Sequence, residues 1–164
     1  MKRLLGAASV AVLVVLLVAC GGSDGSGGDA AGATTATEPT LAEAAAAYLA
    51  LVAPLNAVVG EVNRDLQDVQ SFSEVSGPVT LVREVQRTFR EELLRIRFPE
   101  TVQGQVDDVV AAVEASEGQT DALLDRIDDG TATRADLAAW GSSLQTLAGR
   151  AAVLRRALGL PQAD

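Results

Sequence analysis

The side chains of this sequence leave few catalytic mechanisms open. Its 164 residues include no histidine and a single cysteine, Cys20. Without histidine there is no Ser/His/Asp triad, no Cys/His pair and no Glu-x-x-His metal site. A pair of carboxylates is the one acid–base device that remains, and an aromatic content of 3% offers few faces on which a sugar could stack. The sequence therefore predicts a protein that is not an enzyme, and we expect neither a cofactor nor a metal site.

The single cysteine stands at the end of an apolar N-terminal segment. Lys2 and Arg3 precede an uncharged run over residues 4–19, and a Gly/Ser-rich stretch follows. This order is typical of a signal peptide. The run is shorter than the roughly 20 apolar residues that a membrane-spanning helix needs. We expect no second run of this kind further along the chain.

The residues Leu17-Val18-Ala19-Cys20, followed by glycine, resemble the lipobox of bacterial lipoproteins. The resemblance covers the leader alone, and no family is recognised for the remaining chain. It implies that residues 1–19 are removed, that Cys20 carries a diacylglyceryl group with palmitate-like chains, and that the protein sits on the extracytoplasmic face of the cell membrane. The alternative is an ordinary secretory leader that ends by chance at a cysteine. Heavy use of Arg, Ala, Val and Gly also resembles proteins of high-GC Gram-positive bacteria.

The segment after the leader has the composition of a linker. Residues 20–40 hold the cysteine and then Gly, Ser, Ala and Thr without an apolar period, which predicts a flexible tether with a typical span of roughly 25 Å. The only lysine of the chain, Lys2, lies in the leader, and the net charge is -9. This acidity argues against nucleic acid as a partner. We expect the lipid on Cys20 to hold the protein to its membrane.

Residues 41–164 show four stretches of helical periodicity, each with one row of mainly apolar residues at spacings of three or four, here called a seam. The first seam runs from Leu41 to Val69 and contains Pro54, which predicts either a kink or a split into two helices. A turn is expected over residues 71–77, with Pro78 in the first turn of a second helix.

The remaining boundaries follow from capping and stop signals. Phe98-Pro99 is expected to end the second helix, and the third runs from about Glu100 to a stop at Gly130. The fourth opens on a capping-box-like Thr133 and Asp136 and closes at Gly159 and Pro161. Four helices with short connections predict an all-α domain, an antiparallel up-down four-helix bundle. A three-helix domain with a detached first helix is the alternative.

Two sets of residues are candidates for function. Ser116 and Thr120 interrupt the third seam, so a ligand cavity could form there; alternatively, their hydroxyls bond back to the preceding helical turn. Basic residues lie on the outward side of the second helix among acidic ones, as a docking stripe for an acidic partner or as a solvated face with ion pairs: Arg83, Arg87, Arg90 and Arg97.

The only tyrosine and the only tryptophan, Tyr48 and Trp140, fall on seam positions. Core packing is the expected role of both, and each then needs a polar partner for its O–H or N–H.

These observations predict a lipid-anchored protein of the cell envelope that acts without catalysis. The favoured hypothesis is a protein-interaction or accessory module, held near an envelope partner by its tether. The alternative is a small-ligand-binding or sensing bundle with a cavity near Ser116 and Thr120. A ligand binder should enclose a formed pocket, whereas an interaction module should expose an apolar or charged patch.

Overall fold

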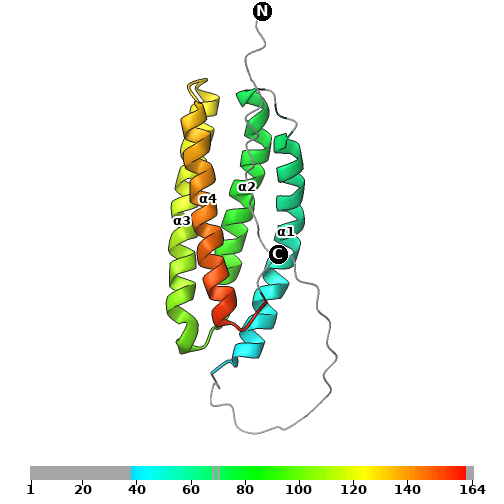
Figure 1. Ribbon diagram of the computed structural model, residues 1–164, viewed down its shortest axis with the longest axis vertical. Coiled ribbons are helices and arrows are strands. Elements are labelled where there is room, and N and C mark those ends of the chain that lie inside the picture. The colour runs from blue at the N-terminus through cyan, green and yellow to red at the C-terminus, as the bar shows by residue number, and fades with distance from the viewer. Residues whose placement is uncertain (1–37, 68, 70, 162–164) are drawn as a thin grey trace, which may run out of the picture.

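The computed structural model describes residues 38–67, 69 and 71–161. This part of the chain forms four long helices, α1 (Leu41–Gln67), α2 (Phe72–Leu93), α3 (Glu100–Asp128) and α4 (Arg134–Ala157), and contains no strand. Successive helices run up and down alongside one another, as the colours of Figure 1 show. The predicted all-α four-helix bundle is confirmed.

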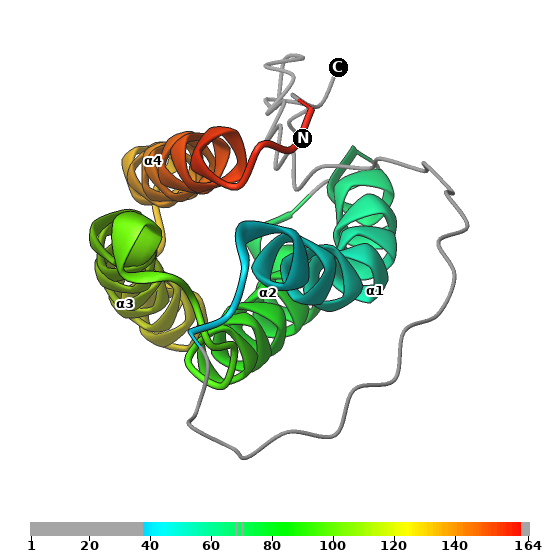
Figure 2. The same cartoon turned by 90° about the horizontal axis from the view of Figure 1, so that it is seen from below.

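The helices pack against one another in the order of the chain. α1 packs against α2, α2 against α3 and α3 against α4, whereas the backbones of α1 and α4 hardly approach each other. Figure 2, seen along the bundle, shows α1 and α4 as the two ends of this row. The first helix is not detached, because Tyr48 of α1 meets the ring of Phe89 of α2 edge-on, with ring centroids 6.5 Å apart. The predicted three-helix alternative is therefore wrong.

α1 begins with a capping box formed by Thr40 and Glu43. The Thr40 N–H donates to Glu43 Oε2 at 2.8 Å, and the Glu43 N–H donates to Thr40 Oγ1 at 3.2 Å. The Thr40 N–H and hydroxyl, both of which donate to the carboxylate, hold the pKa of Glu43 below its usual value. The helix continues past Pro54 as one element and bends along its length in Figure 1.

The start of α2 differs from the expectation. Residues 72–77 are helical, so the turn expected over residues 71–77 is wrong and Pro78 lies inside the helix. The reason is local: Ser71 Oγ donates to Glu74 Oε1 at 2.9 Å, and Val75 is buried in line with Val79. The apolar contact of this extra turn fixes it in helical form despite the Gly77-Pro78 pair.

The later boundaries agree with the sequence signals. α3 begins at Glu100, and Gly130 follows its end with a φ of 68°. The left-handed backbone there is one that glycine adopts without strain. Thr133 and Asp136 form the predicted capping box of α4, and Arg126 of α3 pairs with the Asp136 carboxylate across the connection. Gly159, with a φ of 72°, ends α4.

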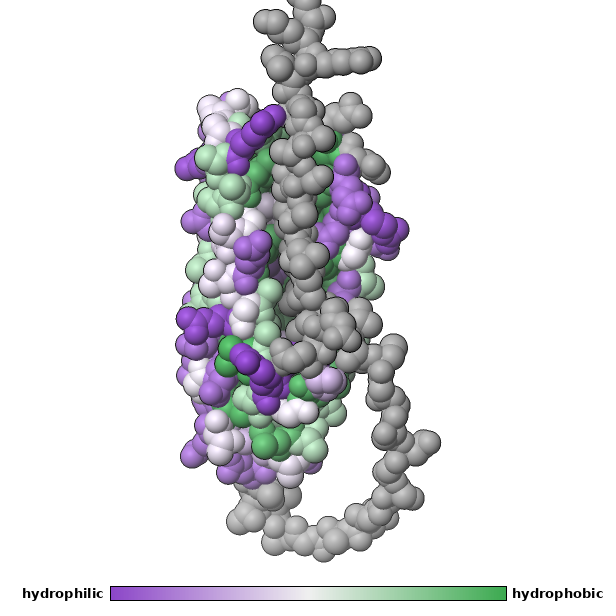
Figure 3. Space-filling model, in the orientation of Figure 1, coloured by the Kyte–Doolittle hydropathy of each residue, from purple (hydrophilic) through white to green (hydrophobic). Residues whose placement is uncertain are grey.

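The core consists of two apolar clusters stacked along the bundle. One lies toward the start of α1 and the end of α4, and includes Tyr48, Phe89 and Leu154. The other lies toward the α1–α2 and α3–α4 connections, and includes Val62, Val79 and Trp140. Figure 3 shows charged residues spread along the visible face and apolar ones gathered toward its lower end. Buried polar side chains lie at the boundary between the two clusters.

Candidate functional site

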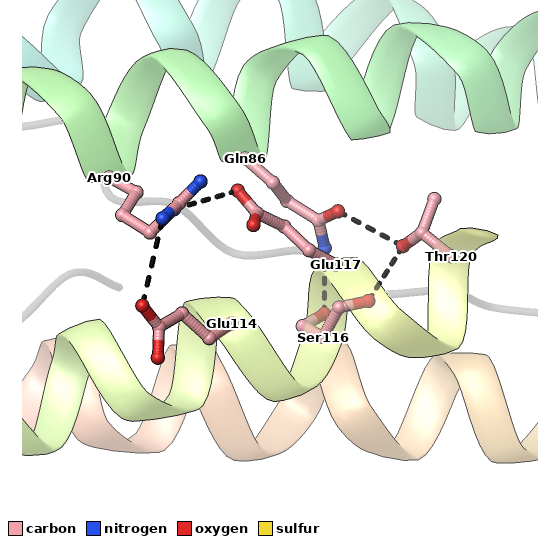
Figure 4. Close-up of polar contacts among 6 residues, drawn as sticks. All are labelled: Gln86, Arg90, Glu114, Ser116, Glu117 and Thr120. Atoms are coloured by element: carbon pink, nitrogen blue, oxygen red, sulfur yellow. Dashed lines mark hydrogen bonds and ion pairs between the residues drawn. The ribbon is translucent and has the colours of Figure 1, made fainter.

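A layer of polar side chains from three helices separates the two apolar clusters. We call it the polar layer; its members are Gln86 of α2, Ser116 and Thr120 of α3, and Trp140 and Ser143 of α4. Gln86 is 3% exposed, and Ser116 and Thr120 are wholly buried. Figure 4 shows Gln86 reaching from α2 toward both hydroxyls of α3.

The hydrogen bonds of the polar layer form a chain with a defined direction. Gln86 Nε2 donates to Ser116 Oγ at 2.7 Å, and Ser116 Oγ lies 3.2 Å from Ser143 Oγ. Because Ser143 Oγ donates its one proton to the Trp140 carbonyl at 2.7 Å, the proton between the two serines belongs to Ser116.

A second branch returns from α4 to α2. Trp140 Nε1 donates to Thr120 Oγ1 at 3.0 Å. Thr120 Oγ1 has one proton, which it can give to Gln86 Oε1 at 3.0 Å or to the Ser116 carbonyl at 2.8 Å. The side-chain groups named here all find partners, as buried polar groups generally must. The polar partner predicted for Trp140 is thereby confirmed.

The candidate cavity residues are thus engaged within the protein. Thr120 bonds back to the preceding turn, as in the alternative reading of this stretch, and Gln86 and Trp140 occupy the space beside it. Two surface depressions lie elsewhere, and neither is lined by Ser116 or Thr120. Sequence reasoning missed Gln86, although it stands at a seam position between Val82 and Phe89.

The four arginines of the expected docking stripe do not share one outward face. Arg83 pairs with Asp121 of α3 at 3.6 Å, while Arg90 pairs with Glu117 at 3.2 Å and Glu114 at 3.6 Å. Both side chains are half-buried and turn toward α3, and Figure 4 shows Arg90 between its two carboxylates. The expectation that all four point outward is therefore wrong for Arg83 and Arg90. Arg87 and Arg97 are exposed.

Tyr48 of α1 and Arg155 of α4 are a second buried polar feature, distant in sequence. Both side chains are 0% exposed. The hydroxyl of Tyr48 has no hydrogen-bond partner, so the partner predicted for it is absent from the described part of the chain. Burial raises the pKa of Tyr48 to about 12, opposed by the nearby positive charge of Arg155.

The outer face of α1 carries small uncharged residues. Residues 44–60 contain no charged side chain, which corrects the expectation that no second uncharged run follows the leader. By length and composition α1 could cross a membrane, although its seam is buried within the bundle. The exposed residues of this uncharged run form what we call the alanine face: Ala46, Ala47, Ala50, Ala53, Pro54, Ala57 and Gly60.

One of the two depressions adjoins this face, and the other lies at the connection between α2 and α3. One, of about 370 Å³, lies between α1 and α2 and is lined by Leu51, Pro54, Thr88 and Ile96, among others. The other, of about 460 Å³, lies where Glu38 accepts a hydrogen bond from the Glu100 N–H at the start of α3.

The predicted lipidation site and any metal site have to be considered separately from these features. Cys20 and the lipobox residues Leu17, Val18 and Ala19 lie outside the described residues. Over residues 38–67, 69 and 71–161, no three Asp, Glu, Cys or His side chains gather as a metal site would require. No protein-family model, curated protein or solved structure matches this chain.

Proposed function

We propose that this protein is a lipid-anchored accessory module of the bacterial cell envelope, which acts by binding another membrane protein rather than by catalysis. The lipobox ending at Cys20 supports the anchor, and the Gly/Ser-rich residues after it supply a tether. Two acyl chains suffice for stable attachment to a bilayer. The tether then keeps the domain at a high local concentration near partners in the same membrane.

The alanine face is the observation that carries the interaction. An outer helix of a soluble bundle normally presents charge to water. α3 does so through Asp107, Asp108 and Asp121, all exposed. In α1, by contrast, the exposed positions from 44 to 60 are alanine, proline and glycine, beside an apolar groove. An uncharged exposed face of this extent marks a contact surface.

The chemistry of this face selects the kind of partner. Small side chains permit close approach of another helix, and helices within membranes associate through such small residues. α1 is also the first element after the tether, so it is the helix nearest the anchor along the chain. The proposed partner is a membrane protein that presents a helix at the membrane surface. Arg87 and Arg97 lie on α2 and just beyond it, and can contact acidic groups of that partner.

Zero-length cross-linking in intact cells tests this interaction. A carbodiimide joins carboxylates of this protein to lysine amines of a partner, and the chain after Cys20 has no lysine with which to link to itself. Glu61 on α1 and Glu92, which lines the adjoining groove, are suitable carboxylates. We expect one membrane protein to be recovered repeatedly, with cross-links at these positions.

A glutamate substituted on the alanine face can be compared with a glutamate substituted at a control position. Ala53→Glu on α1 should abolish the cross-linked product because it puts a desolvated charge in the contact. Ala139→Glu, at an exposed alanine of α4, should leave it intact. Equal yields from both variants would refute the alanine face as the contact surface.

A further inference from the structure

The end of the bundle at which α1 begins, and at which α2 and α4 end, exposes large apolar side chains (Figure 1). Leu41 of α1 is 44% exposed, and Leu94, directly after α2, is 61% exposed. Ile96, Phe98 and Leu160 are half-buried at the same end. Single exposed leucines are ordinary on a protein surface, whereas several apolar side chains at one end mark a contact surface. We call this surface the apolar end.

The chain that follows Cys20 joins the described domain at the apolar end. Glu38 Oε1 accepts a hydrogen bond from the Glu100 N–H at 2.9 Å, in the first turn of α3. Pro99, the residue before α3, provides no side-chain cap, so the Glu38 carboxylate takes that role. Pro39 and Leu94 line the same depression, of about 460 Å³. The tether therefore meets the domain beside the exposed Leu94.

The length of the tether decides which end of the bundle is held near the bilayer. Its composition predicts a typical span of roughly 25 Å. α3 has 29 residues and is therefore about 44 Å long at 1.5 Å per residue. The opposite end of the bundle thus lies farther from the start of α1 than the tether typically reaches. An anchor on Cys20 brings the apolar end to the bilayer first.

The charges at the two ends of the bundle agree with this orientation. In the helix turns and connections of the apolar end, glutamates and arginines are equal in number. At the opposite end the described carboxylates outnumber the arginines, and Asp125, Asp128 and Asp129 at the end of α3 are among them. Anionic headgroups repel carboxylates. The opposite end is therefore the less suitable one to meet a membrane surface.

We propose that the apolar end rests on the lipid surface that holds the Cys20 anchor, with Leu41 and Leu94 in the headgroup region. This inference rests on the lipid anchor of the proposed function. Two leucines give a weak contact on their own, and the anchor makes it effective because it raises the local concentration of the bilayer. The alanine face, which begins little more than one turn into α1, then starts close above the membrane.

A chemically attached lipid tests this contact independently of lipidation in cells. Cys20 is the only cysteine, so the chain that the predicted processing leaves, residues 20–164, can be coupled through its thiol to a maleimide-bearing phospholipid in phosphatidylcholine vesicles. Leu94→Trp places a fluorophore at the apolar end. Leu81→Trp, at a 40% exposed position of α2 about 20 Å farther along the bundle, is the matched control. The native Trp140 is 1% exposed in the other apolar cluster and adds a constant background.

Bromine atoms on the acyl chains quench the emission of a tryptophan that enters the bilayer surface. Leu94→Trp should therefore lose emission in brominated vesicles relative to unbrominated ones, and Leu81→Trp should not. Leu41→Asp, added to Leu94→Trp, should restore the emission because its carboxylate would have to leave water. Leu81→Asp, added in the same way, should leave the quenching unchanged.

Three results would overturn the proposal. The first is equal emission of Leu94→Trp in the two kinds of vesicle, and the second is equal quenching of both tryptophan variants. The third is a blue shift of Leu94→Trp emission with rising protein concentration and no vesicles, which would assign the apolar end to a contact between two copies of the chain. A failure of Cys20 lipidation in cells would leave these vesicle measurements unchanged, so the two proposals fail separately.

Discussion

Gln86 is the residue on which the polar layer depends, because its amide bonds both hydroxyls of α3. Sequence alone could identify Ser116 and Thr120 as interruptions of a seam, but not what they would meet. Their side-chain partners lie 20 to 34 residues away in the chain, and only the packing of three helices brings them together. The sequence shows that the third seam is interrupted, but it does not show the hydrogen-bond network of the polar layer.

Substitution of Gln86 by alanine should destabilise the fold strongly. It leaves the Ser116 and Thr120 hydroxyls short of partners and opens a small cavity, for a loss of roughly 2–4 kcal/mol in the free energy of unfolding. Urea denaturation measures this loss. Gln145→Ala, at an exposed position of α4, is the control and should change stability by less than about 0.5 kcal/mol. Similar values for both variants would show that the network contributes little.

Tyr48 should titrate well above a free tyrosine. It is the only tyrosine, so phenolate absorbance reports on it alone, with an expected pKa of about 12 in the folded protein against 10.0 for an ordinary tyrosine. The raised pKa means that the folded state holds this proton more tightly than the unfolded state. Stability should therefore fall as the pH rises from about 10 to about 12. A midpoint near 10 under folding conditions would show that the hydroxyl is in water.

At the scale of the helices, seams and stop signals predicted most boundaries. Each seam specified which face of a helix is buried, and the αL glycines and the Thr133 capping box placed the ends of α3 and α4. The start of α2 was missed because Gly77-Pro78 is a strong local signal for a turn. The opposing signals, the Ser71–Glu74 pair and Val75 in line with Val79, were present but weaker.

Pro54 is a costly residue within α1. It lacks the N–H that would bond the Ala50 carbonyl, and its side chain is exposed, so it gains little from packing. Pro54→Ala should raise the free energy of unfolding by roughly 1–3 kcal/mol. Pro39→Ala, ahead of the helix, serves as the control with little expected change. A loss of stability in Pro54→Ala would indicate that the bend itself is needed for packing.

The capping box of α4 should contribute measurably to the free energy of unfolding. Thr133 Oγ1 accepts from the Asp136 N–H at 3.3 Å, and the Thr133 N–H donates to Asp136 Oδ2 at 2.8 Å. Thr133→Ala removes the side-chain acceptor and should cost about 1 kcal/mol in urea denaturation. Thr146→Ala, exposed within the same helix, should be neutral or slightly stabilising because alanine is the better helix former. The reverse order of the two variants would contradict the role of the cap.

At the scale of the whole molecule, the sparse backbone contact between α1 and α4 was not predictable. Periodicity tells which face of a helix is apolar, and it predicts closure around one axis when every helix has one seam. It does not tell that Arg155, beside the fourth seam, is buried without a counter-charge in the described part of the chain. Nor does it tell that the outward side of α1 lacks charge until the buried positions are known.

The central proposal is that a lipid on Cys20 holds this bundle at the membrane. Metabolic labelling with an alkyne fatty acid, followed by membrane fractionation, tests it most directly in cells that express the full chain. The wild type and a Ser26→Ala variant of the tether should be labelled and membrane-bound, and Cys20→Ser should lose the label and leave the membrane fraction. A labelled, membrane-bound Cys20→Ser protein would contradict the account.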